Sequence, residues 1–504
     1  MKHHLNRETL LLFVLGLLAT VPYWTLYQDM DDEAAVAALG AVRLLKGELP
    51  YRDWMTRHTP GTYFVTAAYY FVFGSGQWGT RSLMGLVSSL SGLLIHSCSK
   101  QVTSSKLRYL PWVLWTCGSV AEKPELNHHW FGACSTLFTF YWVLRWSLNP
   151  GPRTPIWVGF SAALSSWFLQ SNGLSSLLMV ILVWLRFRPA GLGKTILAYL
   201  LTDLVLWLPW LGYAHEVWLN HLRILTRHIT FNRQAYSWQR LSDLSAFYRH
   251  LDIRFQTIHF LAAWSQFGRV CLQYGLYYIA IPLAWVIAEK RRKRAQIALA
   301  YGCVAWALTT GYCQTIDYLS YAAPAFQLAM LCLLDGQQRL AAGWGLLEIA
   351  GWFFRACSVS VAFCYPIATR AGTYWAADPQ NAYSLNQLHA WIENHCPENS
   401  PVLAYPYFSR VYTLEKLNNP IQQAVLLPWL YEDKEFIDCA AVMDREKTPF
   451  ILHRVLNPDV ILTEYRNTPA EEFRQEYALQ GARIFNHYQK VWEVPGYEVW
   501  ARKP

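Results

Sequence analysis

Long apolar segments separated by short polar or basic ones dominate the sequence as far as residue 365. Several approach the roughly 20 residues that a helix needs to cross a bilayer, and the shorter ones reach that length with their flanking turns. The apolar runs lie at 8–27, 77–98, 109–120, 129–146, 156–170, 174–187, 195–211, 271–288, 295–312, 318–334 and 341–364. We therefore predict a polytopic α-helical membrane protein with about eleven transmembrane helices.

Basic residues orient these predicted helices. If the runs alternate across the membrane, the basic clusters of the short loops all fall on one side, which the positive-inside rule makes the cytoplasm; the long basic loop at 212–270 falls on the other side, where the rule has little force. The clusters lie around Lys2 and Arg7, and at 100–108, 145–153, 186–194, 290–294 and 335–339. A further apolar stretch at 61–74 is too short to span, so we expect an interfacial helix there in the first outer loop. This predicts a multi-pass protein of a bacterial-type inner membrane, with a cytoplasmic N-terminus and the C-terminal segment outside.

Two domains follow from this topology. Residues 1–365 form the transmembrane module, with outer loops at 28–76, 121–128 and 212–270, and residues 366–504 form a small soluble α/β domain on the outer side. In that domain we predict helices over 385–396, 432–446 and 470–477, strands over 401–405 and 459–463, and a hairpin around Pro495-Gly496. Cys396 and Cys439 could form a disulfide in an oxidising compartment, or remain as buried thiols.

Composition supports the membrane assignment. The chain is 53% hydrophobic and only 15% charged, whereas soluble globular chains carry about 25% charged residues. It contains 25 Trp, 30 Tyr and 24 Phe, and aromatic residues are enriched where helices meet the membrane surface. The net charge of +9 does not indicate nucleic-acid binding, because no basic cytoplasmic domain is present.

The first outer loop concentrates carboxylates where the first predicted span ends. Asp29, Asp31, Asp32 and Glu33 precede a predicted helix over 34–46, which Gly47 ends. Acidic residues at this position could simply cap the helix and favour its dipole. A carboxylate at the membrane surface could equally act as a general base on a lipid-linked substrate.

The other two outer loops also carry candidate chemistry. Glu122, Glu125 and His128 could bind a divalent ion such as Mg or Mn, could line an active site without metal, or could form a polar turn. The 212–270 loop is basic, with Arg233 and Arg240 among interleaved aromatic residues. Such a surface suits an anionic lipid-linked substrate or the headgroups of membrane lipids.

The first outer loop also resembles that of a known family. Asp32-Glu33, the following helix, Gly47-x-x-Pro50-Tyr51-Arg52-Asp53 and then His58-x-Pro60-Gly61 resemble the GT-C superfamily of membrane glycosyltransferases. The similarity is greatest to the bacterial branch related to protein O-mannosyltransferases and the lipid A aminoarabinose transferase. The catalytic Asp of the family falls on Asp32, and its Lys-Pro-Pro element falls on His58-Thr59-Pro60, where this chain has neither the Lys nor the first Pro.

The resemblance implies an inverting transfer of a sugar from a polyprenyl-phosphate-linked donor to an acceptor hydroxyl at the outer face. Asp32 would be the general base, supported by Glu33 or Asp31, and Arg57, His58, Arg233 and Arg240 would bind the donor phosphate. The acceptor could be a lipid, a protein or a polysaccharide. The alternative, a transporter or flippase of a lipid-linked sugar, should show an internal repeat, and the sequence shows none.

Overall fold

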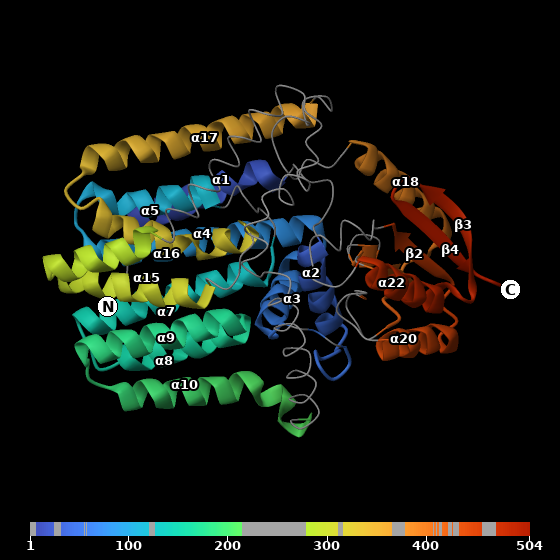
Figure 1. Cartoon of the computed structure of the whole chain (residues 1–504), viewed down its shortest axis with the longest axis horizontal. Coiled ribbons are helices and arrows are strands. Elements are labelled where there is room, and N and C mark those ends of the chain that lie inside the picture. The colour runs from blue at the N-terminus through green and yellow to red at the C-terminus, as the bar shows by residue number, and fades with distance from the viewer. Residues whose placement is uncertain are drawn as a thin grey trace.

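A helical bundle and a smaller α/β unit make up the structure, a computed structural model (Figure 1). The two lie side by side, with helices α2 and α3 at the end of the bundle that faces the α/β unit. The structure describes residues 7–24, 32–54, 56, 58–119, 126–213, 279–310, 316–364, 379–406, 408–409, 411–412, 416–421, 426, 433–455 and 470–504.

Helices occupy the described part of every predicted apolar run. They are α1 (Arg7–Trp24), α4 (Gln77–Val102), α5 (Leu110–Val113), α7 (His128–Leu148), α8 (Thr154–Phe168), α9 (Gln170–Phe187), α10 (Leu192–Trp207), a helix over 279–291, α15 (Arg294–Thr310), α16 (Ile316–Leu333) and α17 (Gln338–Cys364). A 3₁₀ turn, η1 (Lys106–Tyr109), precedes α5, a π-helical segment, η2 (Leu114–Ser119), follows it, and another 3₁₀ turn, η3 (Leu208–Tyr213), extends α10. The fold is that of a polytopic helical membrane protein.

The outside of the bundle is apolar, as a lipid-facing surface must be. Leu197, Leu200, Leu201 and Leu204 of α10 are all more than half exposed. In the described part of the chain, two helical stretches are by themselves long and apolar enough to cross a membrane, Trp78–Val102 (25 residues) and Leu192–Tyr213 (22 residues). The number of spanning helices, about eleven, stays a prediction.

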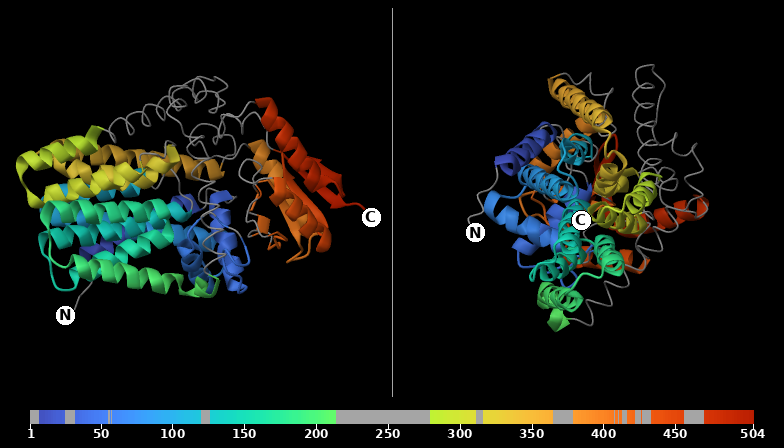
Figure 2. Two further views of the ribbon diagram at one scale, coloured as in Figure 1. Left: turned by 60° about the horizontal axis from the view of Figure 1, so that its bottom comes forward. Right: turned by 90° about the vertical axis from the view of Figure 1, so that its left-hand side faces the viewer.

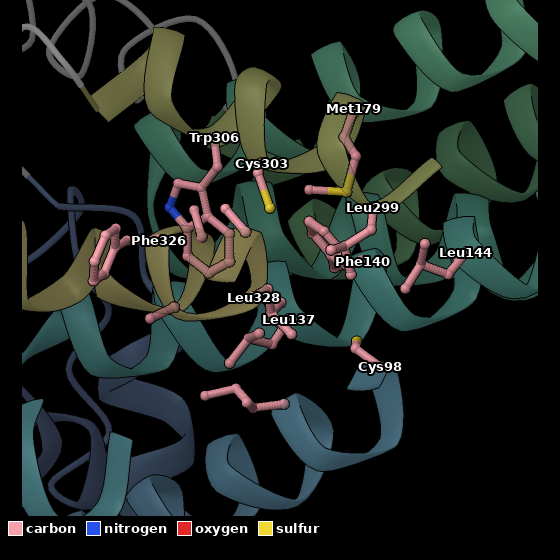
Figure 3. Packing of buried hydrophobic residues seen from close by; sticks show 14 of the residues in the cluster. Cys98, Leu137, Phe140, Leu144, Met179, Leu299, Cys303, Trp306, Phe326 and Leu328 are labelled. Carbon is pink, nitrogen blue, oxygen red and sulfur yellow. The ribbon is translucent and has the colours of Figure 1, made fainter. Parts of the chain in front are cut away.

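Large buried side chains fill the centre of the bundle (Figure 3). Phe140 of α7 and Trp306 of α15 are almost fully buried there, together with Met179 and Phe326. Gly302 of α15 packs directly on Phe140: a Cβ at this glycine would lie 2.5 Å from a ring carbon. The absence of a side chain at Gly302 therefore lets α15 approach α7 closely.

The predicted cytoplasmic loops meet at one end of the bundle. Glu8 bonds to Lys100 (3.0 Å) and Arg108 (3.1 Å), which joins the N-terminus to the next basic loop. The other basic loops are connected in turn by Trp146 Nε1 to the Ala190 carbonyl (2.8 Å), Arg186 to Glu289 (3.1 Å) and Lys293 to Asp335 (2.7 Å). These contacts agree with the alternation on which the orientation was predicted; the orientation itself stays a prediction.

Two short helices lie at the other end of the bundle, beside the α/β unit (Figures 1 and 2). Helix α2 (Asp32–Leu45) packs its alanine face, which includes Ala34, Ala35 and Ala38, near Ala67 and Tyr70 of α3 (Gly61–Phe73). Gly40 is needed there because a Cβ would lie 2.3 Å from the Tyr63 ring. At 13 residues α3 is too short to span, and Phe71 at its C-terminal end is 82% exposed.

The α/β unit is a sheet covered by helices on both faces. The four strands β1 (Val402–Tyr405), β2 (Phe450–Arg454), β3 (Tyr488–Val494) and β4 (Tyr497–Arg502) are ordered β1-β2-β4-β3. The β1–β2 pair is parallel and the other pairs are antiparallel. Helix α18 (Pro379–His395) covers one face, and α20 (Asp433–Arg445) and α22 (Ala470–Phe485) cover the other.

The sequence predictions for this unit met different outcomes. Its helices and the hairpin occur where they were expected, whereas β2 was not predicted and the proposed strand over 459–463 lies outside the described residues. Cys396 and Cys439 are buried in different hydrophobic clusters, and no disulfide joins them to each other.

Candidate active site

The first two candidate carboxylates begin helix α2. Asp32 and Glu33 are its first two residues, so their backbone lies at the positive end of the helix dipole. The side chains of both residues, and the whole of Asp31, lie outside the part of the chain that the structure describes. The structure therefore places the predicted base on the helix that packs against α3 at the end of the bundle beside the α/β unit. This end is predicted to face outward and is called here the outer end. The role of the base stays a prediction.

A compact loop follows α2, and Tyr51 is at its centre. Tyr51 is 3% exposed, its ring packs on Trp207 and Trp210, and its backbone adopts a left-handed conformation (φ 68°). Its N–H donates to the Trp54 carbonyl (2.7 Å), and its hydroxyl donates to the carbonyl of His58. A left-handed tyrosine is an uncommon conformation that its surroundings must enforce, so the end of α10 fixes the position of His58 through Tyr51.

The loop surface also carries an ion pair. Arg52 Nε donates to the Asp53 carboxylate at 2.9 Å, and the Leu49 N–H donates to the same carboxylate at 2.7 Å. The bond from Arg52 holds the pKa of Asp53 below its usual value, and the Leu49 N–H adds to this effect. Asp53 is therefore charged at neutral pH and does not fit the role of a general acid.

His58 and Thr59 are buried where the loop enters α3. Gly61, the first residue of α3, touches the C-terminal end of α8: a Cβ there would lie 2.7 Å from the Trp167 carbonyl oxygen. This close approach holds the His58-Thr59-Pro60 segment against the bundle. The segment corresponds to the predicted donor-phosphate element, and the structure makes it a rigid part of the outer end.

The structure brings two of the predicted outer loops together at His58. Its imidazole stacks on that of His128, with ring centroids 3.6 Å apart, and His128 in turn lies 4.0 Å from His129. All three histidines are less than 9% exposed. His128 and His129 are the first residues of α7, and Asn127 caps this helix by accepting from the N–H groups of His129 (3.0 Å) and Trp130 (3.4 Å).

This cluster of His58, His128 and His129, called here the histidine cluster, has the chemistry of an anion site. Imidazole N–H groups donate hydrogen bonds, and the N-terminus of the 21-residue α7 contributes positive electrostatic potential. His129 and Tyr51 were not among the predicted site residues. The Asn127-His128-His129 sequence before an apolar run is a helix-start signal that could have indicated His129.

The remaining predicted residues cannot be placed. Arg57, Arg233, Arg240, Glu122 and Glu125 lie outside the described residues. Among the residues that the structure does describe, no group of three or more His, Cys, Asp or Glu side chains could hold a metal ion. A metal site formed by His128 with Glu122 and Glu125 therefore stays a prediction.

Comparison with known proteins identifies the fold. No protein-family model and no curated protein sequence matches this chain. Among solved structures, ArnT from Cupriavidus metallidurans bound to undecaprenyl phosphate matches with a TM-score of 0.58 at 12% identity, over 98% of both chains. The protein has the GT-C fold.

Two further GT-C structures agree. ArnT from the same organism in the apo state has a TM-score of 0.57 at 12% identity, over 98% of this chain and 97% of its own. The archaeal oligosaccharyltransferase AglB from Archaeoglobus fulgidus, in complex with an inhibitory peptide and a dolichol-phosphate, has a TM-score of 0.50 at 12% identity, over 99% of this chain and 74% of its own. The resemblance in the first outer loop thus correctly predicted the fold.

Proposed function

We propose that this protein is a glycosyltransferase that moves a sugar from a polyprenyl-phosphate-linked donor to an acceptor hydroxyl at the outer face of the membrane. In this proposal, the protein lies in a bacterial-type inner membrane with its N-terminus in the cytoplasm. The transfer inverts the anomeric centre by direct displacement. The acceptor is a lipid, a protein or a polysaccharide.

The histidine cluster is the main observation that supports this proposal. The GT-C fold alone is compatible with many substrates, because a fold does not by itself fix a function. His58 lies in the segment that corresponds to the donor-phosphate element of the superfamily, and it stacks on His128 at the capped start of α7. A buried group of imidazoles at a helix N-terminus, at the same bundle end as the start of α2, suits the phosphate of a lipid-linked donor.

Asp32 is assigned the role of general base. The leaving phosphate of the donor needs little help from an acid, whereas the acceptor hydroxyl is a poor nucleophile until its proton is removed. Asp32 would accept that proton, with Glu33 or Asp31 beside it. His58, together with Arg57, Arg233 and Arg240, would stabilise the charge that develops on the phosphate.

Substitution of the carboxylates tests the proposal. The purified chain is incubated with undecaprenyl phosphates that carry hexoses or pentoses and with a membrane extract as the acceptor source. Released undecaprenyl phosphate is measured by mass spectrometry. We expect Asp32→Asn to lower the rate by about 10²–10⁴-fold, the usual contribution of a general base, while undecaprenyl phosphate still binds.

Asp29→Asn is the matched control, because it removes a neighbouring carboxylate that has no counterpart in the superfamily motif. If Asp31→Asn abolished turnover while Asp32→Asn did not, the base would be misassigned within the cluster. If Asp31→Asn, Asp32→Asn and Glu33→Gln all left transfer unchanged, the assignment of a carboxylate base would fail. No turnover of any donor by the unaltered chain would refute the glycosyltransferase proposal itself.

A further inference from the structure

Helix α2 packs on two partners at once. One face, with Ala34, Ala35 and Ala38, lies on α3, while Leu39 and Val36 join the hydrophobic cluster of the α/β unit. Leu39 is 4% exposed and belongs to the same cluster as Val411 and Leu417 of that unit. The helix that begins with Asp32 is therefore held between the membrane module and the α/β unit.

Arg43 connects α2 to the α/β unit by hydrogen bonds. Its Nη2 donates to the Ile421 carbonyl at 2.8 Å and to the Asn419 carbonyl at 3.3 Å. The residue is 6% exposed, its Nε lies 3.7 Å from Glu48, and its guanidinium lies over the Trp54 ring. A buried cation with bonds to backbone carbonyls of another unit fixes distance and orientation, because each carbonyl accepts from a defined direction.

Nearby Lys46 makes a weaker connection. Its Nζ donates to the Asn418 side chain at 2.9 Å, but this bond is exposed to solvent. Exposed charged contacts contribute little, since water and salt compete for both partners. Two cations of α2 and its C-terminal turn thus reach the same segment, and only Arg43 does so in a buried setting.

We propose that Arg43 is a positioning residue through which the α/β unit holds α2, and with it Asp32, in place for sugar transfer. This inference rests on the proposed function. Asp32 lies eleven residues before Arg43 on one helix, a distance of about 16 Å at 1.5 Å per residue. A tilt of about 4° at Arg43 would move the first turn by about 1 Å, and a misplacement of that size can cost about a hundredfold in rate.

The test compares Arg43→Met, Arg43→Lys and the matched control Lys46→Met in the full-length chain. Kinetics are measured with the undecaprenyl-phosphate sugar that the unaltered chain turns over, and hydrogen exchange of the same samples reports where amides open. We expect Arg43→Met to lower kcat by about ten- to a hundredfold, with the KM for the donor within about twofold. Exchange should rise in α2 and 416–421 but not in α4 and α7. Arg43→Lys should retain an intermediate kcat, and Lys46→Met should behave as the unaltered chain.

Three results would overturn the inference. The first is faster exchange in α2 with an unchanged kcat in Arg43→Met. The second combines two observations: hydrogen exchange rises throughout α4 and α7 in Arg43→Met, and Arg43→Lys has the same kcat as the unaltered chain. The third is an equal loss of kcat in Lys46→Met. If the unaltered chain transfers no sugar, the proposed function fails first, and the exchange data distinguish that failure because they do not depend on turnover.

Discussion

The two ends of the bundle are stabilised by different interactions. At the end with the basic loops, half-exposed charged groups join neighbouring loops, as in the contacts of Glu8 with Lys100 and of Lys293 with Asp335. At the outer end, buried aromatic rings, glycines in close contact and the histidine cluster replace ion pairs as the main contacts. Exposed ion pairs tolerate small shifts, whereas packed rings and buried polar groups do not. The outer end is therefore the part of the bundle built for precise geometry.

The largest effect is expected at Gly40. In Gly40→Ala the new methyl group would lie 2.3 Å from the Tyr63 ring and 2.8 Å from Trp54, and both rings are almost fully buried. Because neither ring has free space, we expect a loss of about 3 kcal/mol, at the upper end of the range for overpacking. Thermal unfolding in detergent measures it. The control is Gly343→Ala in α17, where an added Cβ would meet no neighbouring atom within 4 Å beyond the local helix backbone, and where a helix former should be neutral or stabilising. Equal stability of the two variants would contradict the contrast between the two regions.

The same contrast explains what the sequence could predict. The apolar runs predicted the helices, and the Asp32–Gly61 motif predicted the fold, because each depends on residues close in the chain. The stack of His58 on His128 could not be predicted, since these residues lie on separate outer loops and only tertiary packing brings them together. The contact of Arg43 with Asn419 and Ile421 spans more than 370 residues and has no local signal. Strand β2 was missed because its residues, Phe-Ile-Leu-His-Arg, do not alternate between apolar and polar, although Pro449 and Asn457-Pro458 flank it.

The next effect concerns the hydroxyl of Tyr51. Tyr51→Phe keeps the ring packed against Trp207 and Trp210 but removes the hydrogen bond to the His58 carbonyl. We expect undecaprenyl phosphate to bind about tenfold more weakly, equivalent to about 1.4 kcal/mol, because His58 loses a hydrogen bond that helps to fix its position. Binding is measured by native mass spectrometry. Tyr213→Phe, at a 47% exposed tyrosine of the same outer end, is the control. Unchanged affinity in Tyr51→Phe would show that His58 does not depend on this bond or does not contact the phosphate.

A smaller effect is expected at the opposite end, at Glu8. Its carboxylate accepts hydrogen bonds from Tyr109 (2.6 Å), Lys100 (3.0 Å) and Arg108 (3.1 Å). Glu8→Gln therefore removes the negative charge to which these three groups donate. We expect a loss of stability of about 1 kcal/mol that becomes smaller in high salt, with donor binding unchanged. Unfolding midpoints in low and high salt provide the measurement. Weaker binding of undecaprenyl phosphate in Glu8→Gln would show that the ion pairs at this end also fix the geometry of the opposite end.

The smallest effect concerns Asp335, between α16 and α17. Its carboxylate accepts from Lys293 (2.7 Å) and Gln296 (3.0 Å), and the bond from Lys293 holds the pKa of Asp335 below its usual value of 3.8. Because the pKa is lowered on folding, the charged carboxylate stabilises the folded chain at pH values above 3.8, and this contribution disappears as the pH falls through the lowered value. The side chain is 26% exposed, so we expect less than about 1 kcal/mol. The unaltered chain should therefore unfold at a slightly higher temperature than Asp335→Asn at pH 7, and the two should converge in strongly acidic buffer. A difference that persisted there would mean that Asp335 acts through neutral hydrogen bonds, and that this end of the bundle also depends on precise geometry.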